Sequence, residues 1–490
     1  MTRKPRVLIA YPNFHRYFVP FFPFYEPLVA ILLGSLVKDF AEVKIFDRRY
    51  ETERAWKKTV REFQPDLIAA RIHTSGEIFT TRRMMTIAKE IHPQAITILG
   101  GQHPTLLPDD FCQPCFDLIC IGAGEETFPE VVKAIANETP FENIKGLAIR
   151  TDNGFIFTEE RPIKSGNFSW PKLDRSLAAK YRKHFPQGIT ITTHGCPHRC
   201  KFCSLWFTAR GTYRLRDPEE IADDIASLPN KVVYIADDNT FHDYKHALEI
   251  YEALKKRGVK KYYGAYARTD TIAEHPEVFE KWKKLGLRYL VVGFEVVSEQ
   301  ALNELNKKTT LENNIKTINI LNRLRINNYA HFIIFPHFTP KDFKELWEFI
   351  KKNNISQPYF ISLTPSPGTI LFKEAKENNQ LSVYNYGFFN LEYMVYKTKL
   401  PKWRYYYEYI KLWILSISPF TYFKMRKHIT LFDYLYRVAI VMRATPAFIR
   451  NVIEQLIEEK RTKYEDIEST LPPSLRKGYK FRYMDETPQE

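Results

Sequence analysis

The sequence is poor in cysteine and has no long uninterrupted hydrophobic run. Six cysteines among 490 residues, without an N-terminal signal sequence, argue against a secreted protein held together by disulfides. No apolar stretch reaches the roughly 20 residues that a membrane-spanning helix requires. We therefore expect a protein of the reducing cytoplasm, with peripheral contact to a membrane left open.

Acidic residues are also in deficit. The chain has 72 Lys and Arg against 57 Asp and Glu, a net charge of +15. This excess predicts a surface that attracts phosphates, acidic lipid or nucleic acid, although a solvated basic surface without a dedicated partner explains it equally well. The length indicates two or three domains, and 44% hydrophobic residues suffice to fill their cores.

Residues 1–150 alternate short apolar runs with longer segments of helical pattern, as repeated βα units do. The expected strands are Val7–Tyr11, Val43–Phe46, Leu67–Ile72, Ile96–Leu99 and Leu118–Ile121. This order predicts an α/β fold with a doubly wound parallel sheet, whose ligands lie beyond the carboxyl ends of the strands. After Ile149 the pattern breaks up at Asp152-Asn153-Gly154, so we interpret residues 151–185 as a linker that lies over the surface.

A second alternating series fills residues 186–390. Its expected strands are Ile189–Thr192, Val232–Ala236, Tyr262–Ala267, Tyr289–Phe294, Ala330–Phe335 and Tyr359–Leu363. Asp217 is the expected N-cap of one intervening helix, with Pro218 at the first helical position and Glu220 three residues after the cap. Six βα units predict an open partial barrel with its chemistry at the strand carboxyl ends.

Residues 391–490 form the last segment, which we expect to be a helical extension in several pieces. Between Lys402 and Lys427 aromatic residues are interleaved with cations, which suits a membrane surface or another anionic interface. Pro419 should interrupt the helical run. Packing of this segment across the barrel mouth, with solvated cations, is the alternative.

Cys196, Cys200 and Cys203 lie in one loop directly after the strand Ile189–Thr192. Three thiolates so close together are able to hold one corner of a [4Fe-4S] cluster and leave one iron for an exogenous ligand. A structural zinc site is the alternative, and it needs a fourth ligand such as His194 or His198.

The other three cysteines carry no such pattern. Cys112 and Cys115 form a pair without a second pair nearby, so we interpret them as small, partly buried thiols. Cys120 should belong to the core of a strand.

The spacing Cys-x3-Cys-x2-Cys, with Phe202 directly before the third cysteine, resembles the signature of the radical S-adenosylmethionine (SAM) superfamily. Four later segments also resemble family motifs: Tyr234–Asn239, Ala267–Asp270, Gly293–Glu295 and Leu305–Thr309. The resemblance implies that the cluster on the three cysteines reduces SAM and releases a 5′-deoxyadenosyl radical. It also implies a SAM site that includes Phe202, Asp237, Asp238, Arg268 and Glu295. Asp237 or Asp238 has the alternative of capping the following helix.

A doubly wound domain in front of such a barrel resembles the cobalamin-binding branch of that superfamily, over about residues 5–385. Glycines at strand ends let a bulky ligand approach the backbone, and the following helix starts offer amides to its phosphate. The resemblance implies cobalamin contacts at Gly100, Gly101, Gly122, Gly124 and Glu125. The branch's Asp-x-His-x-x-Gly motif is absent, because Arg71 stands in place of the Asp in Arg71–Gly76. We therefore assign no cobalt ligand to His73.

The resemblance predicts an enzyme, a methyltransferase or oxidative cyclase acting on an unactivated carbon of a large anionic, lipid-like or tetrapyrrole substrate. The most similar branch contains the anaerobic magnesium-protoporphyrin IX monomethyl ester cyclase. An electron donor such as flavodoxin or ferredoxin is implied, and no catalytic side chain is assigned. One alternative is a non-catalytic corrinoid- or anion-binding protein with a structural metal. Another alternative is a tRNA-modifying radical SAM enzyme. Such enzymes usually carry an extra RNA-binding barrel, and the C-terminal segment shows no strand pattern that would form one. We therefore do not expect nucleic acid as a partner.

Overall fold

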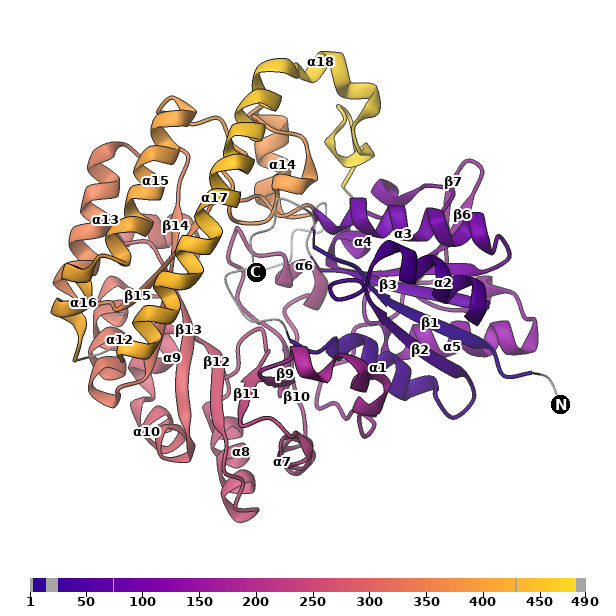
Figure 1. Cartoon of the computed structure of the whole chain (residues 1–490), viewed down its shortest axis with the longest axis horizontal. Coiled ribbons are helices and arrows are strands. Elements are labelled where there is room, and N and C mark those ends of the chain that lie inside the picture. The colour runs from indigo at the N-terminus through magenta and orange to yellow at the C-terminus, as the bar shows by residue number, and fades with distance from the viewer. Residues whose placement is uncertain (1–2, 15–24, 74, 428–429, 482–490) are drawn as a thin grey trace.

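Two α/β domains and a helical C-terminal region make up the computed structural model (Figure 1). It describes residues 3–14, 25–73, 75–427 and 430–481. The C-terminal helices run over the outside of the second domain, and the chain then returns to the first domain.

The N-terminal domain is a seven-stranded sheet in the order β2-β1-β3-β4-β5-β6-β7. Its strands are β1 (Arg6–Tyr11), β2 (Glu42–Asp47), β3 (Leu67–Ile72), β4 (Ile96–Gly101), β5 (Leu118–Cys120), β6 (Leu147–Thr151) and β7 (Gly154–Phe157). Its helices are α1 (Leu28–Val37), α2 (Glu53–Phe63), α3 (Glu77–Ile91), α4 (Gln102–Leu106) and α5 (Gly124–Asn137). The five parallel strands β1 to β5 confirm the predicted doubly wound sheet.

The stretch around residue 150 differs from the prediction. β6 and β7 pair antiparallel with each other, and β6 pairs antiparallel with β5, so Asp152-Asn153-Gly154 forms a hairpin turn at the sheet edge rather than the start of a linker. Farther on, the 3-10 segment Arg175–His184 packs against the N-terminal domain instead of lying only at the surface. Its Tyr181 is buried, and the Asp47 amide donates to the Tyr181 hydroxyl over 3.1 Å. Sequence periodicity missed the hairpin because its strands are short, and it missed the burial of Tyr181 because that contact joins residues far apart in the sequence.

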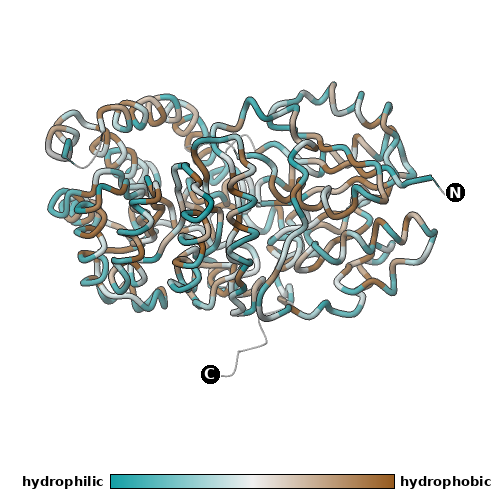
Figure 2. Tube along the Cα trace, turned by 90° about the horizontal axis from the view of Figure 1, so that it is seen from below, coloured by the Kyte–Doolittle hydropathy of each residue, from teal (hydrophilic) through white to brown (hydrophobic). Residues whose placement is uncertain are grey.

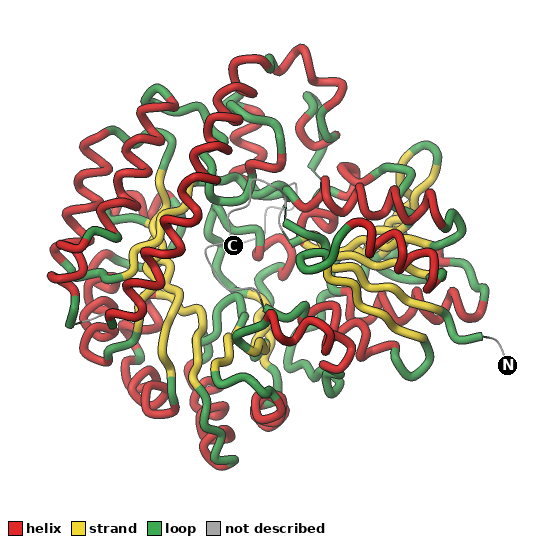
Figure 3. Tube along the Cα trace, viewed as in Figure 1, coloured by secondary structure: helices red, strands yellow, loops and turns green. Residues whose placement is uncertain are grey.

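The second domain is a six-stranded parallel sheet, curved as a partial barrel, in the order β15-β14-β13-β12-β11-β8. Figure 3 shows these strands with helices on their outer side. The strands are β8 (Gly188–Thr190), β11 (Val232–Ile235), β12 (Tyr262–Arg268), β13 (Leu287–Glu295), β14 (Asn327–Ile334) and β15 (Gln357–Ser362). The helices are α7 (Pro218–Ser227), α8 (Tyr244–Lys256), α9 (Thr269–Glu274), α10 (Pro276–Leu285), α11 (Glu299–Glu304), α12 (Leu311–Leu324), α13 (Pro340–Lys352) and α14 (Ile370–Glu377). Asp217 caps α7 as predicted, accepting from the amides of Glu219 and Glu220.

Alternate residues of the barrel strands have different surroundings. Val233, Ala265, Leu290 and Val292 are buried in the core that the strands share with the helices. Residues one position away face the inside of the barrel, since side chains alternate between the two faces of a strand. In Figure 2 the hydrophobic residues follow the sheets of both domains, whereas hydrophilic residues dominate many outer turns.

The C-terminal region consists of α15 (Lys402–Ser416), α16 (Pro419–Met425), α17 (Leu431–Arg461) and α18 (Tyr464–Ile467). The break at Pro419 is confirmed, since it begins α16. The aromatic residues of 402–427 divide into two groups. Tyr405, Tyr406 and Trp413 are buried against the barrel, whereas Trp403 and Phe420 are exposed. No helix among the described residues is long and apolar enough to cross a bilayer.

A buried carboxylate ties the two domains and the chain end together. Asp110 lies on the short helix after α4, and its oxygens accept from the hydroxyl of Tyr386 at 3.1 Å and from the amide and hydroxyl of Ser474 at 2.9 and 2.6 Å. Nε2 of His103 lies 2.9 Å from the same carboxylate. These four side chains are all buried, and Asp110 is the acceptor that they share at the domain junction.

Replacing Asp110 with alanine is expected to lower the free energy of unfolding by about 1–3 kcal/mol, because its buried donors lose their acceptor. Urea unfolding of the full chain measures this loss. Asp109→Ala is the matched control, since Asp109 accepts from the partly exposed Tyr479 hydroxyl at 3.0 Å. Equal stability of the two variants would show that the buried network does not hold the junction.

Candidate functional site

The cysteine loop is held at its base by a small hairpin. β9 (Thr193–Gly195) leads into the loop, and β10 (Tyr213–Leu215) pairs with it after the short helix α6 (Leu205–Ala209). Gly195 has φ +89°, and a Cβ there would lie 2.3 Å from the carbonyl oxygen of Thr212. Only glycine permits this approach. Cys196 and Cys200 are buried, and Cys203 is partly buried.

Asp237 and Asp238, at the end of β11, fasten the start of this loop. One oxygen of Asp237 accepts from the amides of Thr192 and Thr193 at 2.6 and 3.1 Å, and its other oxygen accepts from the Thr192 hydroxyl. Asp238 accepts from the amide of Gly195 at 3.0 Å. Burial raises the pKa of Asp237 to about 6, against these hydrogen bonds. Neither carboxylate caps the next helix, α8, because Asp243 does so.

Two polar side chains approach the cysteine sulfurs directly. Nδ2 of Asn239 lies 3.9 Å from Sγ of Cys196, and Nη1 of Arg268 lies 3.9 Å from Sγ of Cys200. Arg268 also pairs with Asp270 at 2.7 Å. Donors of this kind stabilise sulfur that carries negative charge. Sequence reasoning named Arg268 but missed Asn239, although Asn239 directly follows the two aspartates.

The segment 305–309 also packs against the cysteine loop. The amide of Lys201 donates to the carbonyl of Leu305 at 3.1 Å, and the Asn306 side chain donates to the carbonyl of Arg199 at 2.9 Å. Nζ of Lys307 lies 5.8 Å from the centre of the Phe202 ring. The structure thus brings all five predicted motifs to one end of the barrel.

Glu295 and Lys307 form a buried ion pair at the end of β13, with Nζ 2.5 Å from Oε1 and each side chain only 7% exposed. Glu295 has φ +64°, outside the strand region, so its side chain turns back over Gly293. A Cβ at Gly293 would lie 2.2 Å from Oε1 of Glu295. Lys307 is the counter-charge of the buried Glu295. Lys307 belongs to the motif Leu305–Thr309, but the sequence alone predicted no role for it.

The cysteines fit an iron-sulfur cluster better than a single metal ion. Among the described residues, no three His, Cys, Asp or Glu side chains are arranged as ligands of one ion, so the zinc alternative finds no ligand set there. Each thiolate of a cluster binds a different iron, so the sulfurs need not meet at one point. Burial raises the pKa of Cys203 to about 12 and raises that of Cys196, and metal binding would displace the protons of these thiols.

Gly122 and His73 lie at the carboxyl-end edge of the N-terminal sheet. Gly122 has φ +86°, and a Cβ there would meet no atom of the described residues within 4 Å. His73, at the end of β3, is exposed, yet burial lowers its pKa to about 4. Thr74, in the same motif, lies outside the described residues.

The predicted glycines do not all serve one purpose. Gly101 has φ +121°, and a Cβ there would lie 2.1 Å from the carbonyl oxygen of Ile72, so the contact it permits is with the chain itself. Gly100 and Gly124 would place a Cβ at ordinary distance from Cys120, and Glu125 is partly buried in the first turn of α5. Gly122 therefore provides the best fit to a bulky ligand.

Gly122→Leu is expected to weaken cobalamin binding at least about tenfold, because its side chain would enter the open space beside the backbone. The variant also carries about 1–3 kcal/mol of backbone strain. Gly166→Leu controls for this strain, since Gly166 also has a positive φ, +82°, and a Cβ there would meet no atom of the described residues within 4 Å, but Gly166 lies in the segment 151–185. Cobalamin titration of both variants by visible absorption measures the difference. Equal affinities would remove Gly122 from the ligand site.

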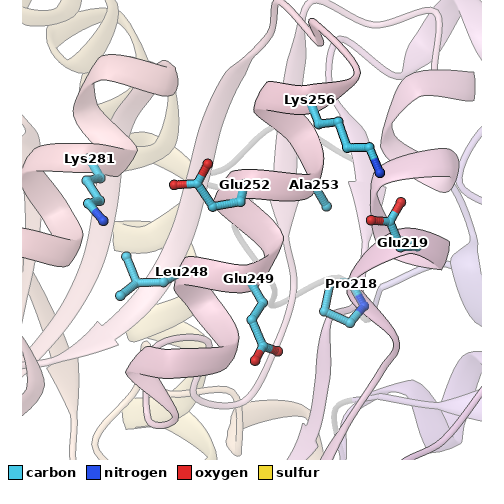
Figure 4. Close-up of a pocket in the computed structure, with 8 residues that line it drawn as sticks. All are labelled: Pro218, Glu219, Leu248, Glu249, Glu252, Ala253, Lys256 and Lys281. Carbon is cyan, nitrogen blue, oxygen red and sulfur yellow. The ribbon is translucent and has the colours of Figure 1, made fainter.

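A hollow of about 590 Å³ on the outer side of the barrel lies apart from these motifs (Figure 4). It is lined by residues of α7, α8 and α10, among them Glu249, Glu252 and Lys281. No cysteine contributes to it, and we do not assign it to the functional site.

Two of the remaining cysteines behave as expected of structural thiols. Cys115 and Cys120 are buried, and burial raises the pKa of both. Cys112 is an exposed residue, and partial desolvation of its thiol together with the nearby Asp109 charge raises its pKa. Cys112 belongs to the N-terminal domain and is exposed, so it is a useful control position.

Comparison with known proteins agrees with this geometry. Residues 190–350 match the radical SAM superfamily, and residues 25–132 match the B12 binding domain. The chain is 25% identical to the hopanoid C-3 methylase of Methylococcus capsulatus, over 79% of this chain and 75% of that protein. It is 27% identical to the anaerobic magnesium-protoporphyrin IX monomethyl ester cyclase of Cereibacter sphaeroides, over 80% of this chain and 67% of that protein.

Two solved structures share the fold. One is the radical SAM methyltransferase TsrM from Kitasatospora setae with cobalamin and a [4Fe-4S] cluster bound, with a TM-score of 0.70, 15% identity and coverage of 91% of this chain and 100% of that one. The other is the cobalamin-dependent SAM radical enzyme OxsB, with a TM-score of 0.69, 18% identity and coverage of 89% and 72%. The chain belongs to the radical SAM enzymes that carry a B12-binding domain, and its cofactors are a [4Fe-4S] cluster, SAM and cobalamin.

Proposed function

We propose that this enzyme modifies an unactivated carbon of a large, mainly apolar substrate, such as a lipid or a tetrapyrrole, by C-methylation or oxidative cyclisation. When bound, the cluster and SAM supply a carbon-centred radical and cobalamin supplies a methyl carrier or redox partner. The protein's own contribution is to hold the substrate between the two domains and to exclude water. The observation that carries the proposal is the lining of the barrel.

Tyrosines from neighbouring strands cover the inner face of the barrel. Tyr234 stacks on Tyr25 with ring centres 4.8 Å apart, and Tyr289 meets Tyr329 edge to face at 5.5 Å. Gly264 leaves room for this arrangement, because a Cβ there would lie 2.0 Å from the Tyr289 ring. Aromatic walls of this kind favour large apolar or planar ligands.

Side chains of this lining are desolvated. Tyr266 keeps 39% of its surface accessible, yet burial raises its pKa. His331 stacks on Tyr359 at 4.8 Å, and burial lowers its pKa to about 4, so its ring is neutral. Its Nε2 is buried without a hydrogen-bond partner among the described residues. A neutral imidazole in an aromatic wall suits a single polar group on an otherwise apolar substrate.

The remaining site residues follow from the same proposal. Cys196, Cys200 and Cys203 would hold the cluster; Phe202, Asp237, Asp238, Arg268 and Glu295 would surround SAM. Gly122 and its neighbours would border cobalamin. A flavodoxin or ferredoxin would supply electrons, and contact with a membrane would be peripheral.

Anaerobic reconstitution with iron, sulfide and cobalamin, followed by mass spectrometry of the products formed with methyl-labelled SAM, tests the proposal. Candidate substrates are an isoprenoid lipid extract and a magnesium-porphyrin ester. Label found in the substrate indicates methyl transfer, whereas 5′-deoxyadenosine with an unlabelled, more oxidised product indicates cyclisation. Reconstituted protein that forms no 5′-deoxyadenosine with SAM and reductant would overturn the proposal.

A further inference from the structure

Large apolar side chains lie at the surface of α16 and α17. Phe420 is 87% exposed and Phe432 is 76% exposed. Single exposed apolar residues are ordinary, but a group of them over two neighbouring helices marks an interaction surface. We define the C-terminal docking surface by the six large apolar residues of α16 and the first half of α17 that are more than half exposed: Phe420, Phe423, Leu431, Phe432, Leu435 and Met442.

The two helices are fixed to each other beneath this surface. The rings of Tyr422 and Tyr434 stack with centres 4.5 Å apart, and the Tyr434 hydroxyl donates to the carbonyl of Ile417 at 2.9 Å. The Thr430 side chain caps α17 by accepting from the amide of Asp433 at 3.1 Å. The exposed rings therefore project from an ordered base, and Figure 1 shows α16 beside the start of α17 on the outside of the barrel.

The exposed charges of the segment that carries the docking surface are of one sign. Between Lys402 and Arg450 the sequence has nine Lys and Arg but only two acids, Glu408 and Asp433. Glu408 is buried, and Asp433 is partly buried and bonded to Thr430 and Asn327. The exposed charged side chains described there are all cations: Lys411, Arg426, Lys427, Arg443 and Arg450.

We propose that this surface docks the enzyme on a bilayer that contains anionic lipid. Exposed phenyl rings beside cations, without exposed acids, are what an interfacial helix needs to enter the headgroup layer and to attract phosphates. A second copy of the chain fits poorly, because a two-fold contact would place these cations opposite one another. The occupant that matches both the rings and the charge is the membrane surface.

The docking surface lies next to an edge of the barrel. Asp433 accepts from the Asn327 side chain at the start of β14 over 3.2 Å, and Arg437 donates to the carbonyl of Pro358 in β15. β15 is an edge strand of the barrel sheet. A docked enzyme would therefore hold an edge of its tyrosine-lined barrel at the bilayer, where apolar substrate is concentrated. This last step rests on the proposed function, whereas docking does not.

Flotation of the reconstituted full chain with vesicles tests the docking. Vesicles of phosphatidylcholine mixed with phosphatidylglycerol should carry the protein, and pure phosphatidylcholine vesicles should carry much less. Phe420→Ser with Phe432→Ser should weaken binding at least about tenfold. Arg426→Gln with Lys427→Gln should reduce binding to the mixed vesicles and weaken its dependence on salt.

Ile156→Ser is the matched control, because Ile156 is 56% exposed but lies on the β7 hairpin of the other domain. The Ile156→Ser variant should float like the unaltered chain. All variants should have the thermal midpoint and the SAM cleavage of the unaltered chain. Failure of the unaltered chain to float, or flotation of the double phenylalanine variant at its level, would overturn the proposal. The proposal would also be overturned if the unaltered chain bound no vesicles and sedimented as a dimer that the double phenylalanine variant converted to a monomer. SAM cleavage is measured separately, so a failed docking test leaves the proposed reaction untouched.

Discussion

Cys200→Ala is expected to lose the cluster and with it all cleavage of SAM. Cys200 is buried, and Arg268 lies 3.9 Å from its sulfur, so alanine removes a thiolate from a site with no spare cysteine nearby. Iron and sulfide content after reconstitution, the visible absorption of the cluster and the yield of 5′-deoxyadenosine measure the result. Cys196→Ala and Cys203→Ala should behave in the same way.

Cys112→Ala is the matched control for this experiment. Cys112 is an exposed cysteine of the N-terminal domain, and its replacement should leave iron content and SAM cleavage unchanged. If Cys200→Ala kept its cluster, or if Cys112→Ala lost it, the assignment of the three ligands would be wrong. A milder variant, Asn239→Ala, should retain the cluster but bind it about 10–100-fold more weakly, as loss of a group behind a metal ligand does.

The sequence predicted the two domains because strands of a parallel sheet are continuous apolar runs separated by helices. It also predicted the cysteine loop, since a cluster needs thiolates at short and fixed spacing. The hairpin of β6 and β7 escaped prediction because four or five residues give too little alternation. The buried part of the linker escaped because Tyr181 packs against Asp47, 134 residues away.

Side-chain partners were harder to predict than positions. Asp237 and Asp238 were placed correctly at a strand end, but their hydrogen bonds to Thr192 and Gly195 depend on how β8 and β11 pair in the sheet. The tyrosines of the barrel appear in the sequence as isolated residues on separate strands. Only the curved sheet brings Tyr234, Tyr266 and Tyr289 onto one face. Contacts between distant segments are set by tertiary structure, which periodicity does not contain.

Breaking the ion pair of Glu295 and Lys307 is expected to lower the free energy of unfolding strongly. Glu295→Gln leaves the Lys307 ammonium buried without its counter-charge, and such a loss costs about 3–5 kcal/mol of unfolding free energy. Glutamine preserves the size of the side chain and its acceptor oxygen, so the change reports on charge rather than on packing. Urea unfolding of the apoprotein measures this cost without any contribution from SAM.

The double variant Glu295→Gln with Lys307→Met separates charge from shape. Because it removes both buried charges together, it should be more stable than Glu295→Gln alone, by an amount that the double-mutant cycle gives directly. Equal stability of the single and double variants would show that the pair is not coupled. SAM binding then distinguishes the two roles of Glu295: a purely structural acid would let the stable double variant bind SAM normally, whereas an acid that contacts SAM would leave it unable to bind despite its restored stability.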